Sequence, residues 1–205
     1  MKKIQLFMLI VATSTLLFSC GNIKKKVEDK INEAVEEVAN DLESAFTTVN
    51  TVKVNELFSV EIPTSLSETY DLNEEASLQY ENIAEEYYVI AIDENKQEFF
   101  EVINDGATED EMITEEEILD IYSYIQFTTF ATDDQYFETK DIEVNGLKAQ
   151  ELDIISTFED FGIFYRMACY EGEENLYFVV VWTMEDSKDE HDASMQKIIE
   201  SFKEL

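Results

Sequence analysis

The sequence predicts an α+β fold in which an antiparallel β-sheet is flanked by helices and preceded by a long amphipathic helix. Three observations support this prediction. Apolar and polar residues alternate in several segments after residue 53. The pair Asn145-Gly146 separates two of these segments, as the turn of a β-hairpin does. Apolar stripes at helical spacing mark residues 24–46 and two later segments.

The composition favours one globular domain with an extremely acidic surface. Of the 205 residues, 45% are hydrophobic, which is enough to fill the core of one ordinary domain. The formal net charge is -33, from 14 Lys and Arg against 47 Asp and Glu. Proteins that bind nucleic acid need Lys and Arg against the phosphates, so this composition excludes that class.

Residues 1–19 have the features of a signal peptide. Lys2 and Lys3 form a positive start, an apolar stretch follows as far as Phe18, and the small Ser19 precedes Cys20. The apolar stretch is shorter than the roughly 20 residues that span a bilayer. The run Leu17-Phe18-Ser19-Cys20 resembles the lipobox of bacterial lipoproteins. The resemblance implies cleavage between Ser19 and Cys20, a diacylglycerol on the Cys20 sulfur, and often a further acyl chain such as palmitate on the new amino group.

This lipid anchor predicts attachment to a membrane of the bacterial cell envelope, because two or more acyl chains hold a protein stably on a bilayer. In many Gram-negative bacteria, an acidic residue directly after the lipidated cysteine retains a lipoprotein in the inner membrane. This chain has Gly21 at that position and so lacks the signal. We therefore expect the outer membrane, with the protein facing the periplasm, and surface exposure stays open. Once Cys20 is acylated, Cys169 is the only remaining thiol, so no intramolecular disulfide is expected.

Residues 20–52 are expected to form a lipidated N-terminus with a stalk helix over 24–46. Fully helical, this segment is ~35 Å long. The narrow apolar stripe is equally compatible with a helix docked on the domain and with self-association through a short coiled coil. Residues 47–52 are expected to be a polar break before the domain. The stripe consists of Val27, Ile31, Val35, Val38, Leu42 and Phe46.

The domain, residues 53–205, is expected to begin with three strands and a helix. The stretch LFSVEIP alternates up to Pro63, and SLQYENI and EEYYVIAIDE continue the strand pattern, whereas NKQEFFEVIND leaves a short helix open. In TEEEILDIYSYIQFTTF, Thr114 and Glu117 have the spacing of a capping box. The residues that follow predict a helix with one apolar face, formed by Ile118, Ile121, Tyr122 and Ile125.

Four strands and a final helix complete the prediction. YFETKDIEV and LKAQELDIIST flank Asn145-Gly146, and DFGIFYRMACYE and LYFVVVWTME flank the turn GEEN. Because LYFVVVW is continuously apolar, we expect a central strand that is covered on both faces. The closing helix has its apolar face on Met195, Ile198, Ile199 and Phe202.

This order of elements, opened by LFSVEIP and closed by MQKIIESFKEL, resembles the PsbP-like family, which includes the Ran-binding Mog proteins and the bacterial DcrB lipoproteins. The resemblance covers residues 53–205 and implies an antiparallel sheet sandwiched by helices, an α/β/α arrangement. It also implies a noncatalytic binding or assembly module. No functional residue of the family can be transferred to this chain.

Direct inspection for catalytic and metal sites identifies no cofactor and no metal ligand set. His191 is the only histidine, which excludes zinc sites that need two imidazoles, and we expect it to be an exposed residue at a helix start. Cys169 alternates with apolar residues and is expected to be a buried structural thiol. Trp182 is expected in the core. With 5 glycines in the chain, phosphate-binding loops are excluded as well.

The acidic and aromatic residues leave two questions open. The segment NDGATEDEMITEEE is rich in carboxylates but lacks the EF-hand pattern, so calcium binding by the acidic surface stays undecided. The pairs Tyr87/Tyr88 and Phe99/Phe100 fit sugar stacking as well as core packing.

Two functional hypotheses follow. The first is a lipid-anchored, noncatalytic interaction or assembly module with an unknown envelope protein as its partner. The second is an envelope protein that binds solutes or glycans, or hydrolyses them, through surface carboxylates and aromatics. The first is favoured because no positioned base or nucleophile emerges from the sequence.

The substitution Cys20→Ser is expected to block maturation and abolish labelling by a fatty acid, since the acylated sulfur is removed. Radiolabelled fatty acid incorporation and the mass of the accumulated precursor measure this, with Cys169→Ser as the control that keeps the lipobox. Normal labelling of the Cys20→Ser protein would refute the lipid anchor.

Overall fold

A computed structural model describes residues 48–205, apart from 109–111, 132–136 and 159–160. Within it, Thr47–Leu205 is one compact unit. The predicted signal peptide, the cleavage between Ser19 and Cys20, the lipidation of Cys20 and the helix over 24–46 lie outside the described residues.

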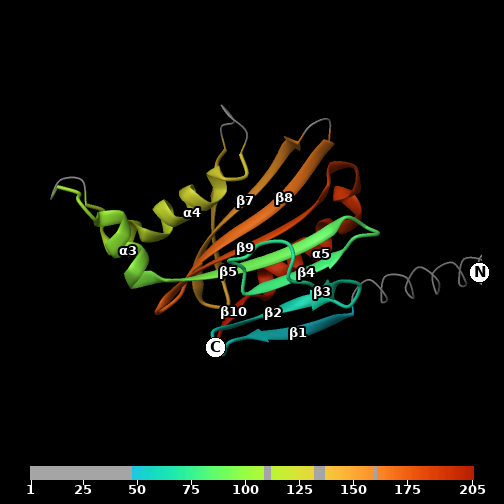
Figure 1. Cartoon of the computed structure of the whole chain (residues 1–205), viewed down its shortest axis with the longest axis horizontal. Coiled ribbons are helices and arrows are strands. Elements are labelled where there is room, and N and C mark those ends of the chain that lie inside the picture. The colour runs from blue at the N-terminus through green and yellow to red at the C-terminus, as the bar shows by residue number, and fades with distance from the viewer. Residues whose placement is uncertain (1–47, 109–111, 132–136, 159–160) are drawn as a thin grey trace, which may run out of the picture. The chain divides into compact units, whose positions relative to one another are not determined.

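The main sheet of the described residues has seven strands, and every neighbouring pair is antiparallel (Figure 1). In spatial order it contains β3 (Ser67–Glu68), β4 (Leu78–Asn82), β5 (Tyr87–Asn95), β9 (Asn175–Met184), β8 (Phe161–Glu171), β7 (Leu147–Phe158) and β6 (Lys140–Val144). The continuously apolar β9 is the middle strand and is buried on both faces, as predicted.

A second, three-stranded sheet has the order β1 (Val49–Val54), β2 (Phe58–Pro63) and β10 (Lys203–Glu204). The sequence predicted β2 but not its partners. Residues 47–52, expected to be a polar break, instead supply most of β1. This strand lies at an edge of its sheet with most of its side chains half-buried or exposed, so it lacks a clear apolar alternation.

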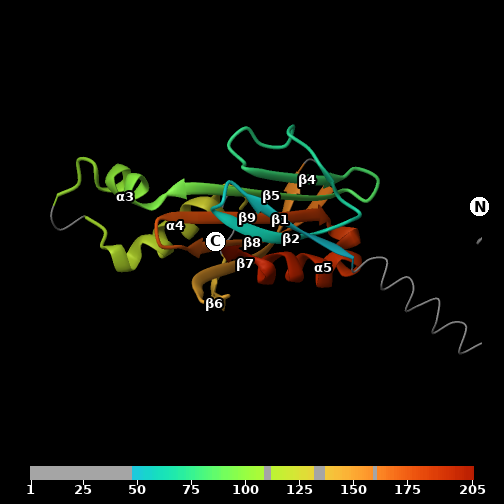
Figure 2. The ribbon, with the colours of Figure 1, turned by 90° about the horizontal axis from the view of Figure 1, so that it is seen from below.

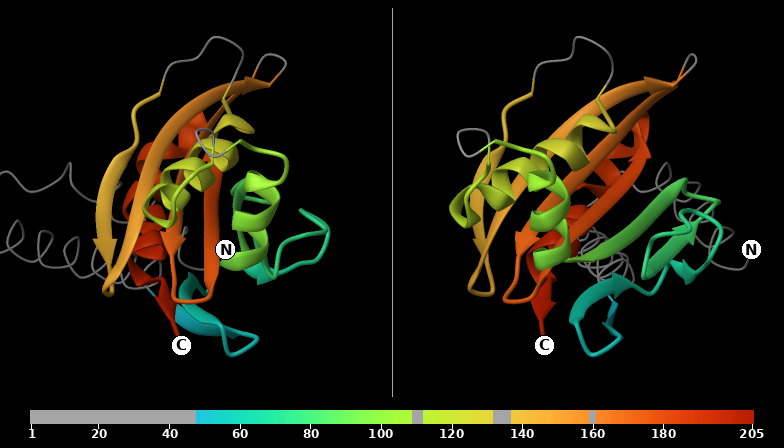
Figure 3. Two further views of the ribbon diagram at one scale, coloured as in Figure 1. Left: turned by 90° about the vertical axis from the view of Figure 1, so that its left-hand side faces the viewer. Right: turned by 60° about the vertical axis from the view of Figure 1, so that its left-hand side comes forward.

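Helices cover the two faces of the main sheet (Figures 2 and 3). The closing helix α5 (Lys188–Ser201) and the small sheet pack on one face, and α3 (Lys96–Asn104) and α4 (Ile118–Thr128) pack on the other. The ambiguous segment after β5 is therefore the helix α3. The α+β fold with an antiparallel sheet flanked by helices is confirmed.

The predicted local signals form as expected. Asn145 and Gly146 have φ of 50° and 89°, the left-handed values that a two-residue hairpin turn requires. A short 3-10 turn at Glu115–Glu117 precedes α4, and the Glu117 carboxylate accepts hydrogen bonds at 2.8 Å from the backbone N–H and the hydroxyl of Thr114. These bonds stabilise the ionised form and lower the pKa of Glu117.

The end of the chain joins the small sheet to the main sheet. Phe202, fully buried after α5, stacks on Phe58 of β2 at 5.2 Å and on Tyr170 of β8 at 4.2 Å between ring centroids. It also contacts Tyr177 of β9 at 5.0 Å. The Tyr170 hydroxyl donates to the carbonyl of Ile199 at 2.8 Å. One aromatic side chain thus contacts three strands from two sheets.

Around this cluster, polar contacts fix the same segment. The Asn145 side-chain amide donates to the carbonyl of Phe202 at 2.7 Å, so the β6–β7 turn is tied to the end of α5. The backbone N–H of Glu61 in β2 donates to the hydroxyl of Ser201 at 2.9 Å. The Tyr177 hydroxyl donates to the Glu204 carboxylate at 3.0 Å.

The substitution Phe202→Ala is expected to destabilise the domain by about 3 to 5 kcal/mol, because it leaves a cavity where two sheets meet. Urea unfolding followed by tryptophan fluorescence measures the change. Leu205→Ala, at an exposed position, is the control and is expected to change the free energy of unfolding by less than about 0.5 kcal/mol. Equal effects of the two substitutions would contradict the role given to Phe202.

Candidate functional site

Cys169 is a buried thiol in β8, as predicted. Burial raises the pKa of Cys169 well above its ordinary value, so the thiol stays protonated at neutral pH. This environment does not activate a nucleophile.

His191 lies in the first turn of α5, as predicted, but the predicted exposure of its side chain is wrong. The side chain is only 5% exposed, and its ring stacks on Tyr87 with the centroids 4.3 Å apart. The reason is helical spacing: His191 lies four residues before Met195 and seven before Ile198, on the buried face of α5. This spacing is present in the sequence, but the charged neighbours of His191 conceal it.

Arg166, the only arginine of the chain, connects three elements close to His191. Its guanidinium donates to both carboxylate oxygens of Asp153 in β7, at 2.8 and 2.6 Å, and to the carbonyl of Asp192 in α5 at 3.0 Å. Burial alone disfavours the charged form, yet the carboxylates of Asp153, Asp192 and Glu151 outweigh it and raise the pKa of Arg166. The arrangement fastens α5 to the sheet.

Of the two aromatic pairs considered for sugar stacking, Tyr87/Tyr88 and Phe99/Phe100, one side chain is buried and three are half-buried. Tyr87 is buried and donates to the Ser194 hydroxyl at 3.0 Å, whereas Tyr88 is half-buried on the opposite face of β5. Phe99 and Phe100 are both half-buried. Phe99 meets Tyr122 of α4 edge to face, with centroids 5.2 Å apart.

Trp182 is not fully buried in the core, contrary to prediction; it is half-buried and packs against the edge of the core. It occupies the end of β9 that is remote from α3 (Figure 1). Its ring stacks on Tyr88 at 5.2 Å with an interplanar angle of 15°, and Tyr165 lies on its other side at 6.4 Å. Both contacts are cross-strand pairs, because Trp182 lies opposite Tyr88 of β5 and opposite Tyr165 of β8.

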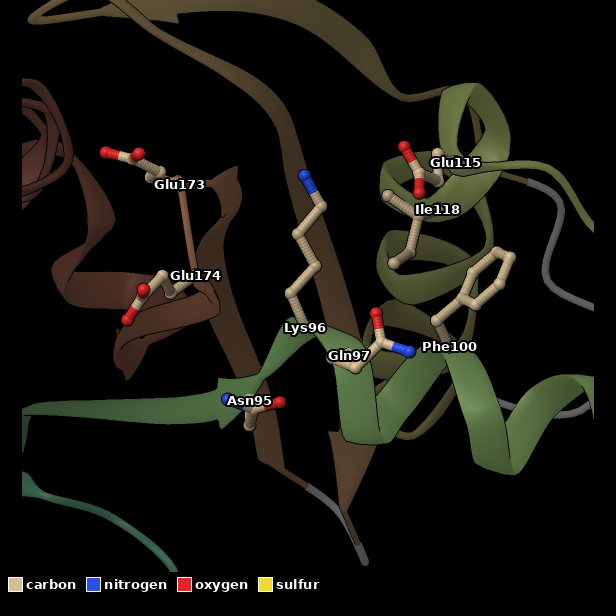
Figure 4. Close-up of a pocket in the computed structure, with 8 residues that line it drawn as sticks. All are labelled: Asn95, Lys96, Gln97, Phe100, Glu115, Ile118, Glu173 and Glu174. Carbon is tan, nitrogen blue, oxygen red and sulfur yellow. The ribbon is translucent and has the colours of Figure 1, made fainter.

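A hollow in the described residues adjoins the start of α3 (Figure 4). Asn95 caps this helix by accepting from the backbone N–H of Glu98 at 2.9 Å. The backbone N–H of Lys96 donates to the carbonyl of Glu174 at 3.0 Å, which brings the β8–β9 turn beside α3. The resulting Lys96 pocket has a volume of about 410 Å³. It is lined by Asn95, Lys96, Gln97, Phe100, Glu115, Ile118, Glu173 and Glu174.

The Lys96 pocket is acidic on both sides. Figure 4 shows the Lys96 side chain between Glu173 and Glu174 on one side and Glu115 and Ile118 on the other. The Lys96 ammonium is itself paired with Glu171, with 2.5 Å between Nζ and Oε1. Within the described residues, none of the three glutamates that line the pocket forms an ion pair.

A second hollow lies beside the same helix and shares Asn95 with the first. This Phe99 pocket has a volume of about 380 Å³ and is lined by Asp93, Glu94, Asn95, Glu98, Phe99 and Val102. Val102 is 72% exposed. Together, the two pockets place six carboxylates next to several apolar side chains around α3. Such a surface favours a ligand that carries both positive charge and apolar groups.

No group of His, Cys, Asp and Glu side chains in the described residues is arranged to hold a metal ion. The segment raised for calcium includes 109–111, which are not described, so that question stays open. In the described part, no helix has the length and apolarity to cross a bilayer.

Among the comparisons with known proteins, the likeness to cyanobacterial PsbP supports the fold. No family model and no curated protein matches the sequence. Cyanobacterial PsbP (CyanoP) from Synechocystis sp. PCC 6803 has a similar structure, with a TM-score of 0.52 and 10% identity over 77% of this chain and 93% of that chain. LpqN, involved in cell envelope biogenesis of Mycobacterium tuberculosis, gives a TM-score of 0.48 and 8% identity over 77% and 91%. The predicted PsbP-like fold is confirmed.

High pH is expected to destabilise the domain because Tyr87, Tyr122 and Tyr170 are buried and burial raises their pKa in the folded state. In the unfolded chain they ionise near pH ~10. Below that pH both states are protonated and stability is unaffected. Above it the unfolded state loses protons first, so the free energy of unfolding falls by about 1.4 kcal/mol per pH unit for each tyrosine.

Urea unfolding in steps from neutral pH to about pH 11 tests this alkaline loss. Tyr122→Phe removes one titrating hydroxyl and is expected to make the decline shallower. A free energy of unfolding that stays constant over this range would contradict the burial of these hydroxyls.

Proposed function

We propose that this protein is a lipoprotein of the bacterial cell envelope, anchored through Cys20, whose domain is a noncatalytic module that binds another envelope protein. The lipobox at Leu17 to Cys20 supports the anchor. The proposed address is the outer membrane, facing the periplasm. The PsbP-like fold agrees with a binding module, because the resemblance from which it was predicted implies one.

The observation that carries the binding role is the acidic and apolar surface around α3. The Lys96 and Phe99 pockets share Asn95 and lie beside the first turns of one helix. Their volumes, about 410 and 380 Å³, are large enough for one or two side chains of a partner. A partner segment with Lys or Arg next to an apolar residue complements both the carboxylates and the side chains of Phe100 and Ile118.

The negative charge of the protein favours such a partner both during encounter and in the bound complex. The net charge of -33 attracts a basic segment from afar and accelerates encounter. Close by, Glu115, Glu173 and Glu174 offer carboxylates on both sides of the Lys96 pocket. The one ammonium in the pocket is paired with Glu171, which reduces its repulsion of an incoming cation.

Glycan binding through aromatic stacking has weaker support. A sugar needs an uncovered ring face, and the Trp182 ring stacks on Tyr88 at 5.2 Å and has the tilted ring of Tyr165 beside it at 6.4 Å. None of these three residues lines the Lys96 pocket or the Phe99 pocket, so the half-exposed aromatic row and the acidic hollows are separate surfaces.

The binding role is tested by replacing Glu115, Glu173 and Glu174 together with Gln. The expected result is a loss of about tenfold in recovery of a specific envelope partner, because three charges at the pocket are removed. Crosslinking in intact cells, followed by mass spectrometry, measures the recovery. The matched control neutralises three exposed glutamates elsewhere, Glu56, Glu61 and Glu143.

The two triple variants carry the same net charge, so a general charge effect changes both equally. An unchanged partner set in the Glu115, Glu173 and Glu174 variant would reject the pocket as the binding surface. Binding of the purified partner should also weaken as salt is raised.

A further inference from the structure

Strand β1 has a free edge along the described residues. It pairs with β2 on one side, and no described strand pairs with it on the other. Asn50, Thr51 and Lys53 are exposed. An unpaired strand edge carries a row of backbone N–H and C=O groups that can accept another strand.

The hydrogen bonds of the β1–β2 hairpin show which residues point their backbone groups outward. The carbonyl of Thr48 accepts from the N–H of Thr64 at 2.9 Å. Pro63, which has no N–H, lies opposite Val49. Since hydrogen-bonded and non-bonded pairs alternate in an antiparallel ladder, Asn50, Val52 and Val54 bond to β2. Three residues therefore present their N–H and C=O groups to the free edge: Val49, Thr51 and Lys53.

We propose that β1 pairs antiparallel with β1 of a second copy of this chain, with Thr51 opposite Thr51. A two-fold axis perpendicular to the sheet then places Val49 opposite Lys53 on both sides of the axis. In this register all three outward residues of each copy exchange backbone hydrogen bonds. If the register is shifted by two residues, one of the three outward residues of each copy has no residue of the other β1 strand opposite it. The two small sheets become one continuous sheet.

Local charge opposes a second copy little at this edge. β1 contains no carboxylate, and in the proposed register its one charged residue, Lys53, faces Val49. The paired threonines add a favourable cross-strand contact. The whole chain is strongly acidic, so a strand without carboxylates is where two copies approach with least local repulsion.

The edge strand β6 is less suited than β1 to pairing with a second copy. Val144 and Leu147 flank the two-residue turn and form its closing hydrogen-bonded pair, so Asp141 and Glu143 point their backbone groups outward. If β6 paired symmetrically with β6 of a second copy, Asp141 would face Asp141, or Glu143 would face Glu143, or Asp141 would face Glu143. Each of these registers places two carboxylates opposite each other, which is destabilising. Of these two edges, only β1 is free of this conflict.

This inference goes beyond the proposed function, since β1 lines neither pocket. The pairing of two copies and the binding of a basic partner are also expected to respond differently to salt. Because the two copies carry like net charge, added salt is expected to strengthen the pairing, whereas it weakens the binding of a basic partner.

The test is a symmetric disulfide. Directly opposite hydrogen-bonded residues have Cα atoms about 5.5 Å apart, which suits a disulfide. The full-length chain with Thr51→Cys, oxidised in intact cells, is expected to give at least tenfold more covalent homodimer than Asp141→Cys on the exposed edge of β6. Cys169 is buried, and the unsubstituted chain gives the background. The yield of homodimer is measured in both the membrane fraction and the soluble fraction of the cells. A protein that is not anchored therefore still reports on the β1 pairing.

Equal yields from Thr51→Cys and Asp141→Cys would overturn the proposal, as would capture of a different protein at Thr51→Cys in place of the homodimer. A second measurement is sedimentation velocity on the detergent-purified full-length chain. The unsubstituted chain and Thr51→Val are expected to dimerise with rising concentration and salt. Thr51→Glu is expected to remain monomeric with an unchanged circular dichroism spectrum. Dimers of Thr51→Glu, or monomers of all three chains, contradict the pairing.

Discussion

The packing of Phe202 between two sheets is the interaction on which the rest of this structure depends. Its ring contacts Phe58 of the small sheet, and Tyr170 and Tyr177 of the main sheet. The chain end then continues as β10 along β2, and the Leu205 N–H donates to the carbonyl of Leu57 at 2.9 Å. Phe58 also meets Tyr177 directly, edge to face at 5.6 Å, so loss of the Phe202 ring removes the middle of an aromatic cluster that joins the small sheet, the main sheet and the end of α5.

The same arrangement determines which surfaces are available for binding. The small sheet and α5 occupy one face of the main sheet, so β1 is left at the rim with its outer edge free of described strands. On the other face, α3 and α4 cover the part of the sheet near the β8–β9 turn. The acidic pockets form there because the turn glutamates and the start of α3 are held together. The six carboxylates that line the two pockets are thus held together by the fold, where the basic partner that we propose would bind.

Much of the fold is predictable from local signals, and the exceptions have physical reasons. Asn145-Gly146, the capping box at Thr114 and the apolar run of β9 are determined by nearby residues, and all three form as predicted. β1 was missed because an exposed edge strand does not need an apolar alternation. His191 was predicted to be exposed because its charged neighbours hide a helical spacing that places it on the buried face of α5. The Lys96 pocket could not be predicted, since β8, β9 and α3 meet there only through the tertiary fold.

Native-state hydrogen exchange tests most directly whether the two sheets and the chain end form one cooperative unit. The decisive comparison is between the amides of Val60 in β2 and Val180 in β9. Our account predicts that both exchange through global unfolding, with the same free energy of opening and the same denaturant dependence. If the Val60 amide exchanges with a free energy of opening several kcal/mol below that of Val180, the small sheet opens on its own. The packing of Phe202 would then not hold the two sheets together.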